Sequence, residues 1–272
     1  MNISFLGPET TFTHIAAISH FGEKNSFAPK KSIAEVFESV EKNETDFGVV
    51  PVENSTEGSV AHTLDSFFES KLKITAEIVI PINQCLIGNT KKSKISKIFS
   101  HSQAIGQCRK YIAKNFPDAE ILECASTASA AMLALKEKNS AAIASILAAK
   151  KFGLKVIEEK INDEYNNQTR FFVIGKKESK AGNKNKTTIL FSTKNVPGAL
   201  YKVLGIFSKY NINMTKIESR PSKKKTWEVV FFIDFEGHKE DEKIKKALLE
   251  LHEYCDFLNV LGSYPTKTGI ID

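Results

Sequence analysis

The chain contains the stretch Asn167-Gln168-Thr169-Arg170-Phe171-Phe172-Val173-Ile174. Its apolar end predicts a β-strand. Side chains alternate between the two faces of a strand, so Thr169 and Phe171 should share one face and Arg170 should lie on the other. A hydroxyl, a ring and a guanidinium therefore stand together where the strand begins. Such a triplet is weak evidence for a site unless other motifs accompany it.

Outward from this stretch, the chain repeats one unit: a short apolar strand, a small polar loop and an amphipathic helix. The clearest helix spans residues 32–40, where Ser32 and Glu35 predict a capping box and apolar residues recur at helical spacing. A continuous apolar strand over residues 47–50 is expected to end at Pro51. Strands that alternate with helices predict an α/β fold with a largely parallel sheet.

Two extended segments interrupt this alternation. Residues 74–88 form a long extended stretch, and residues 169–175 form a second one. We expect both to cross between two lobes, approximately residues 1–78 plus 168–176 and residues 79–167. Residues 177–186 are rich in Lys, Gly and Asn and lack apolar periodicity, which predicts a linker.

The tail, residues 187–272, has a different pattern. Strands are expected over 187–192, 213–219, 228–235 and 257–262, with one amphipathic helix after the first strand and another after the third. This βαββαβ order is ferredoxin-like. An antiparallel sheet of this kind has a surface left to cover, so pairing with a second copy is expected.

Composition excludes several classes of protein. The net charge is +6, but the segment 176–186 contributes +4 and Lys223-Lys224-Lys225 adds +3, so the charge sits in loops and not on a nucleic-acid-binding face. No apolar run approaches a membrane span, and the start of the chain shows no basic leader, so a cytoplasmic protein is expected. The four cysteines have neither CxxC pairing nor metal-ligand spacing, which predicts core thiols in a reducing compartment.

Four further motifs accompany the triplet. Near the start are Leu6-Gly7-Pro8-Glu9-Thr10-Thr11-Phe12 and the segment 51–58, Pro-Val-Glu-Asn-Ser-Thr-Glu-Gly. In the tail are Gly198-Ala199-Leu200 and Glu218-Ser219-Arg220-Pro221. In this order and at this spacing, the motifs and Thr169-Arg170-Phe171 resemble monofunctional prephenate dehydratase with a C-terminal ACT regulatory domain, over essentially the whole chain.

The resemblance implies both fold and reaction. It implies an α/β protein with a two-lobed, periplasmic-binding-protein-like (type II) catalytic domain over residues 1–176 and a ferredoxin-like ACT domain over residues 187–272. The implied reaction is the decarboxylative dehydration of prephenate to phenylpyruvate, water and carbon dioxide, a hydro-lyase step of L-phenylalanine biosynthesis. Aromatisation drives this reaction, so no metal or redox cofactor is expected, and the sequence has no motif for either.

The resemblance also assigns roles to residues. Thr169 is expected to hydrogen-bond the leaving hydroxyl, Arg170 to clamp the pyruvyl carboxylate and Phe171 to pack near the ring. The proton for the leaving group is expected from water, from His101 or from a protonated Glu53. The other expected substrate contacts are Thr11, Asn54, Ser55, Ser126, Thr127 and Asn167, together with Glu53 and His101.

Structural readings of the same residues remain open. Ser126 and Thr127 are also typical helix N-caps, and several such loops on one sheet edge suit an anion. A lone histidine such as His101 is commonly a hydrogen-bonded structural residue, and Glu53 can simply order its loop. Thr10 stands where the family usually has glycine, which removes easy access to positive φ.

In the tail, the family binds L-phenylalanine between subunits, which implies feedback inhibition of a homodimer or homotetramer. The implied effector residues are Gly198, Ala199, Leu200, Asn213, Met214, Glu218, Ser219, Arg220 and Pro221. Tyr201 replaces the small apolar residue usual in the family. Two alternatives keep the same architecture: an arogenate dehydratase, and a non-catalytic amino-acid sensor.

Overall fold

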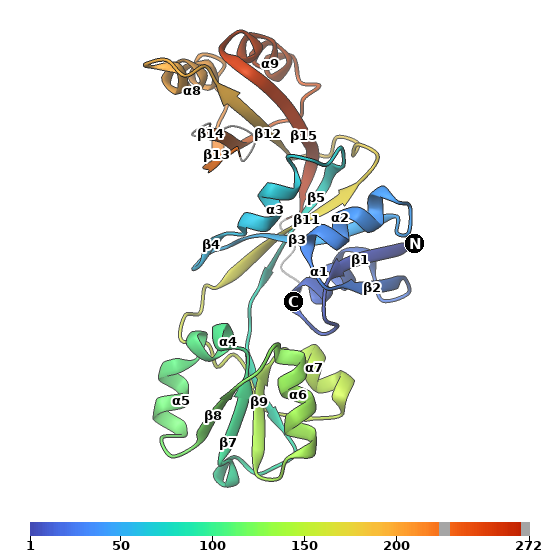
Figure 1. Cartoon of the computed structure of the whole chain (residues 1–272), viewed down its shortest axis with the longest axis vertical. Helices are drawn as coiled ribbons and strands as arrows, with labels where there is room; N and C mark the ends of the chain where they lie inside the picture. The colour runs from blue at the N-terminus through green and yellow to red at the C-terminus, as the bar shows by residue number, and fades with distance from the viewer. Residues whose placement is uncertain (223–228, 268–272) are drawn as a thin grey trace. The chain divides into compact units, whose positions relative to one another are not determined.

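The computed structural model describes residues 1–222 and 229–267, and it divides into two compact units (Figure 1). The first contains Met1–Ser66 and Val79–Phe171; the second contains Phe67–Ile78 and the described residues from Phe172 onward. Within the described residues, no helix is long and apolar enough to cross a membrane. The lysines at 223–225 and the expected strand start at 228 lie outside the described residues.

The first unit begins with a parallel sheet. Strand β1 (Asn2–Leu6) lies between β2 (Ser26–Lys30) and β3 (Phe47–Asn54), and both neighbours run parallel to it. The helices of this lobe are α1 (Phe12–Phe21), α2 (Ile33–Glu41) and α3 (Ala61–Ser66), and the short β4 (Gly58–Ser59) pairs with β3. Ser32 caps α2 by accepting from the Glu35 N–H, whereas the Glu35 carboxylate accepts from the Lys31 N–H, so the reciprocal half of the capping box shifts by one residue.

The second lobe of this unit has its own sheet, in the order β10-β6-β9-β7-β8. Its strands are β6 (Cys85–Gly88), β7 (Lys97–Ser100), β8 (Glu120–Glu123), β9 (Ser140–Ala144) and β10 (Lys155–Glu158). Its helices are η1 (Lys92–Lys94), α4 (Ser102–Gln107), α5 (Arg109–Asn115), α6 (Thr127–Lys136) and α7 (Ile146–Phe152). Small alanines of α6, β9 and α7 pack together in one of the two core clusters of this lobe.

The two extended segments are strands β5 (Lys73–Pro81) and β11 (Gln168–Gly175). One carries the chain into the second lobe and the other carries it out. They are neighbours in the sheet, and just outside both strands the Ile82 N–H donates to the Asn167 carbonyl at 2.9 Å. This contact brings the end of one crossing beside the start of the motif that contains Thr169.

In the second unit, the βαββαβ order is confirmed. It comprises β12 (Asn185–Thr193), α8 (Ala199–Lys209), β13 (Met214–Pro221), β14 (Val229–Glu236), α9 (Glu242–Tyr254) and β15 (Cys255–Lys267). The antiparallel strands lie in the ferredoxin-like order β13-β14-β12-β15, over a core that both helices cover. At Gly262, an added Cβ would lie 2.2 Å from the Ile74 carbonyl oxygen, so only glycine permits this approach of two backbones.

Several element boundaries differ from the expectation. Strand β3 continues through Pro51 to Asn54: β1 pairs only with residues 47–49, so the missing N–H of Pro51 costs no hydrogen bond on that side. Strands β2, β4 and β10 were not expected, because they are short and lack a clear alternation.

Candidate functional site

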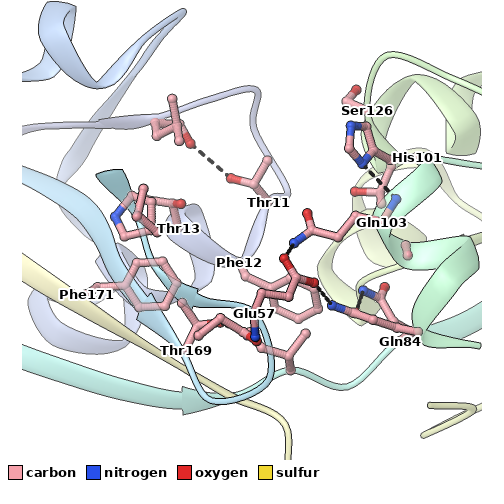
Figure 2. Close-up of a pocket in the computed structure, with 18 of the residues that line it drawn as sticks. Thr11, Phe12, Thr13, Glu57, Gln84, His101, Gln103, Ser126, Thr169 and Phe171 are labelled. Carbon is pink, nitrogen blue, oxygen red and sulfur yellow. Dashed lines mark hydrogen bonds between the residues drawn. The ribbon is translucent and has the colours of Figure 1, made fainter. Parts of the chain in front are cut away.

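A cavity of about 470 Å³ lies in the first unit, a size suited to a small organic ligand (Figure 2). Both lobes and both crossing segments line it. Its lining comes from the loop after β1, from β3 and the turn after it, from the crossing segments, and from α4 and the start of α6. The lining includes Thr11, Asn54, Glu57, Gln84, His101, Gln103, Gln107, Ser126, Thr127, Thr169 and Phe171.

The alternation expected on β11 is confirmed. Thr169 and Phe171 are buried and line the cavity, whereas Arg170 does not. The guanidinium of Arg170 lies 3.8 Å from the Glu53 carboxylate, and Glu53 is likewise absent from the lining. On each strand, neighbouring side chains point to opposite faces. Glu53 and Arg170 therefore pair with each other while their neighbours Asn54 and Thr169 face the cavity.

Asn54 sets the direction of the Thr169 hydroxyl. The Asn54 Oδ1 accepts from the Thr56 and Glu57 backbone N–H groups at 3.0 and 3.1 Å, which fixes the amide orientation. Its Nδ2 then donates to the Thr169 Oγ1 at 2.8 Å and to the Asn167 Oδ1 at 2.7 Å. Because the threonine oxygen already accepts a hydrogen bond, its own O–H is left to donate into the cavity.

The loop after β1 contains one residue with a strained backbone, Thr10. Thr10 has φ 73°, in the region that glycine occupies easily, so the loop keeps this backbone although the glycine usual in the family is absent. Two hydrogen bonds hold it there: the Thr10 N–H donates to His14 Nδ1 at 3.1 Å, and its carbonyl accepts from Ser145 Oγ at 2.7 Å. The Thr10 hydroxyl has no partner within residues 1–222 and 229–267.

Three helices begin at the cavity. Thr11 caps α1, His101 caps α4 and Ser126 caps α6, each by accepting a backbone N–H. The Thr11 hydroxyl also donates to the Leu6 carbonyl at 3.2 Å, so its hydrogen is already used. The His101 Nδ1 accepts from the Gln103 N–H at 3.3 Å, which leaves the hydrogen of the neutral ring on Nε2. The capping reading of Ser126 is thus correct, and helix N-termini also give the cavity a positive potential.

Two residues predicted to contact the substrate, Ser55 and Asn167, do not line the cavity but hold the surrounding loops in place. The Ser55 Oγ accepts from the Gln168 N–H at 3.0 Å and donates to the Asn166 carbonyl, which ties the turn after β3 to the start of β11. Asn167 is buried and accepts from Asn54. Thr127, by contrast, is part of the lining.

Six polar lining residues were not predicted: Thr13, Glu57, Ser59, Gln84, Gln103 and Gln107. The Glu57 carboxylate accepts from the side-chain amides of Gln103 and Gln107, the latter at 3.0 Å, and so joins the turn after β3 to α4. The Gln84 amide in turn donates to the Gln107 Oε1 at 3.1 Å. Glutamine side chains on a helix belong to no recognisable sequence motif. Of these residues, only Glu57 lies in a motif, the segment 51–58, that could have indicated it.

The cavity holds no cationic side chain, because all its lining residues are described and none is Lys or Arg. Residues 1–222 and 229–267 contain no group of three His, Cys, Asp or Glu side chains that could hold a metal ion. The cysteines are free, and burial raises the pKa of Cys108 to about 12, so it is an inert core thiol. The site can therefore bind an anion through neutral donors and helix N-termini.

The effector residues predicted in the tail fall in two places. Gly198, with φ 76°, caps α8 ahead of the buried Ala199 and the half-buried Leu200. Asn213 is exposed just before β13, and Met214, Glu218, Ser219, Arg220 and Pro221 lie on β13 itself. This strand is at the end of the ferredoxin-like sheet, with β14 as its neighbour. Tyr201 is 80 % exposed.

Comparison with known proteins supplies the family. The model described as prephenate dehydratase matches residues 3–179, and the model described as ACT domain matches residues 187–253. A bifunctional chorismate mutase/prephenate dehydratase of Aquifex aeolicus is 48% identical over 266 residues, which are 97% of this chain and 74% of the relative. The prephenate dehydratase of Methanocaldococcus jannaschii is 44% identical over 238 residues, 86% of each chain.

A solved structure agrees. Prephenate dehydratase from Arthrobacter aurescens, in complex with L-Phe, superposes with a TM-score of 0.89 at 32% identity and covers 97% of this chain and 90% of that chain. The predicted fold class, an α/β dehydratase domain followed by a ferredoxin-like ACT domain, is confirmed. The chain belongs to the prephenate dehydratase family.

Proposed function

We propose that this chain is a carbon–oxygen lyase that converts prephenate to phenylpyruvate, water and carbon dioxide. One observation carries the proposal within the family: Thr169 faces a cavity that has no Lys or Arg, and its hydroxyl is left as a donor by Asn54. The reaction expels the C4 hydroxyl and the ring carboxylate loses its charge. A cation on that carboxylate would stabilise the ground state, whereas a neutral donor on the leaving hydroxyl assists the step.

Each residue near Thr169 then has a role. Thr169 donates to the leaving oxygen, and Phe171 packs against the ring. The N-termini of α1 and α6, with Thr11, Ser126 and Thr127, receive the carboxylates. His101 presents an N–H to the cavity, so a proton can reach the leaving group through it or through water.

We propose a role for Arg170 and Glu53 that differs from the one expected from the sequence. A clamp on the pyruvyl carboxylate does not fit a guanidinium that is paired with Glu53 on the face away from the cavity. We propose instead that this ion pair holds β3 and β11 in the register that places Asn54 beside Thr169. Ser55 and Asn167 support the same register.

The regulatory part of the proposal concerns the tail. We propose a dehydratase domain over residues 1–176, a linker over 177–186 and an ACT domain over 187–272. L-phenylalanine would act as inhibitor through the start of α8 and through β13, whose outer edge is suited to pairing with a second copy in a homodimer or homotetramer. Inhibition requires that L-phenylalanine has different affinity for two arrangements of the protein.

The test measures phenylpyruvate formation from prephenate, with arogenate in parallel and with L-phenylalanine added to each. Turnover of prephenate that L-phenylalanine suppresses is the expected result. Turnover of arogenate alone would identify the alternative substrate. If neither substrate reacts while L-phenylalanine still raises the melting temperature, the chain is a sensor and not an enzyme.

A further inference from the structure

We propose that Thr13 binds the pyruvyl carboxylate of the substrate through its hydroxyl, together with the free N–H groups at the start of α1. The inference rests on the proposed function, because it assigns one of the two carboxylates of prephenate. It adds to the site a residue that none of the motifs above includes. The role of Thr13 is binding, since the charge that it holds is present in the substrate and in the product.

Thr13 lies in the first turn of α1 and lines the cavity (Figure 2). It is buried, with 6 % of its surface exposed. Its hydroxyl makes no hydrogen bond to any of residues 1–222 and 229–267. Unlike the hydroxyl of Thr10, it is not enclosed by its neighbours, so a ligand in the cavity can reach it. A buried hydroxyl that still lacks a partner favours a ligand that supplies one.

The neighbouring hydroxyl of Thr11 cannot be this donor. Its oxygen accepts from the His14 N–H, and its hydrogen is donated to the Leu6 carbonyl. Thr11 thereby caps the helix and leaves the N–H groups of Phe12 and Thr13 without a partner inside α1. Neither of these groups donates to another residue in the described part of the chain. The start of α1 therefore offers three donors, two N–H groups and the Thr13 O–H.

Three donors at the positive end of a helix suit a carboxylate. Hydrogen bonds to an ionised acceptor are the strong ones, and the dipole of a ten-residue helix such as α1 adds to them. The lining residues, all of which are described, include one acidic side chain, Glu57. Its carboxylate already accepts from Gln103 and Gln107. The donors of α1 are thus available to an anion that enters the cavity.

The two carboxylates of prephenate have different fates. The ring carboxylate leaves as carbon dioxide and loses its charge, so tight binding there would slow the step. The pyruvyl carboxylate keeps its charge and can be bound tightly without this cost. The start of α6 also presents a threonine to the cavity, Thr127, but that residue is half-buried whereas Thr13 is buried. Because hydrogen bonds to a charge strengthen where water is excluded, the retained charge belongs at Thr13.

The test uses Thr13→Val, which keeps the shape of the side chain and removes the O–H. The product phenylpyruvate retains the pyruvyl carboxylate and lacks the ring carboxylate, so its competitive inhibition constant reports on the pyruvyl carboxylate alone. We expect KM for prephenate and the inhibition constant of phenylpyruvate to rise together, about 10- to 100-fold, while kcat stays within about twofold. The melting temperature should stay the same or rise, because valine buries no hydroxyl without a partner.

Two further variants accompany Thr13→Val. Thr13→Ser restores the hydroxyl and should return both constants to within about threefold of wild type. Thr90→Val is the matched control, because it makes the same change at a half-buried threonine outside the cavity lining.

Three results for Thr13→Val would overturn the inference alone, provided that the wild type turns over prephenate. A higher KM with an unchanged inhibition constant for phenylpyruvate would assign Thr13 to the ring carboxylate. A lower kcat with an unchanged KM would place Thr13 in the chemical step. Wild-type values of all three constants would leave Thr13 without contact to the substrate. A wild-type protein without prephenate turnover overturns the proposed function and this inference with it.

Discussion

Two hydrogen-bond networks line the same cavity, and they differ in the hydrogen-bonding group that each leaves without a partner. In the Asn54 network, backbone N–H groups fix the Asn54 amide and Thr169 is left as a donor. In the Glu57 network, a carboxylate fixes the Gln107 amide and Gln84 is left as an acceptor. Backbone N–H groups hold the first network, whereas a single carboxylate holds the second.

Loss of the donor should have the largest effect. Thr169→Val keeps the shape of the side chain and removes the O–H, so we expect kcat to fall about 10³-fold, as for other single donors placed on a reacting oxygen. Thr169→Ser restores the donor and should stay within about tenfold of wild type. Steady-state kinetics with prephenate measure both variants, and a Thr169→Val enzyme with near-normal kcat would show that Thr169 is not the donor.

Reversal of the donor should rank second. Asn54→Asp replaces the Nδ2 that donates to Thr169 by an oxygen, so the Thr169 hydroxyl would turn toward the new carboxylate and away from the cavity. We expect kcat to fall about 10²-fold. Thr56→Ala is the comparison: it removes the Thr56 hydroxyl that donates to the Asn54 Oδ1 at 2.6 Å but keeps both backbone N–H groups that fix this amide. An equal loss in both variants would mean that the turn after β3, and not the direction of the hydroxyl, had changed.

Loss of the charge in the other network should have a smaller effect. Glu57→Gln keeps the size of the side chain but can both donate and accept, so it no longer dictates the orientation of the Gln107 amide. We expect kcat/KM to fall about 5- to 20-fold, because a carboxylate no longer holds the amides of Gln103 and Gln107 to the turn after β3. In the double variant Glu57→Gln/Gln107→Met, the second change should add little, since the two side chains share one hydrogen bond. Additive losses would show that the two residues act separately.

The smallest effect should come from acid, and it should leave both networks intact. Burial lowers the pKa of His14, whose Nδ1 accepts from Thr10. Because the folded-state pKa lies below the unfolded value of about 6.5, the stabilisation is complete above that pH and is lost as the pH falls through the folded-state pKa. Between pH 7.5 and 5 the wild type should lose roughly 1–3 °C more in melting temperature than His14→Phe, which retains a ring beside Phe5. Parallel curves would exclude His14 as the titrating group.

The sequence contained much of the first network and little of the second. Thr169, Phe171 and Asn54 belong to contiguous motifs, and strand alternation placed the first two on the cavity side. Gln84 comes from a crossing segment and Gln107 from a helix. Gln107 contacts Glu57, and Gln84 contacts Gln107, only because the chain folds the two lobes around one cavity. Arg170 shows the opposite case: its motif suggested a substrate contact, while the alternation that places Thr169 turns Arg170 toward Glu53.

For the fold, too, local features could be predicted from the sequence and contacts between distant segments could not. Periodicity and capping signals identified α2 and the order of elements in the tail, because those signals are local. The close approach of Gly262 to Ile74, by contrast, depends on two segments far apart in the chain. The backbone of Thr10 also ran against local preference: its N–H donates to His14 and its carbonyl accepts from Ser145, and these two hydrogen bonds hold a threonine at positive φ.

The lack of Lys and Arg around the cavity also bears on how fast a dianion is captured. Cationic side chains attract an anion over a Debye length, about 8 Å at physiological ionic strength, whereas helix N-termini and neutral amides act only at contact. Encounter should therefore proceed at the rate of an unsteered collision, and kcat/KM should change little as salt is added. An enzyme built this way would bind its substrate after arrival and not draw it in.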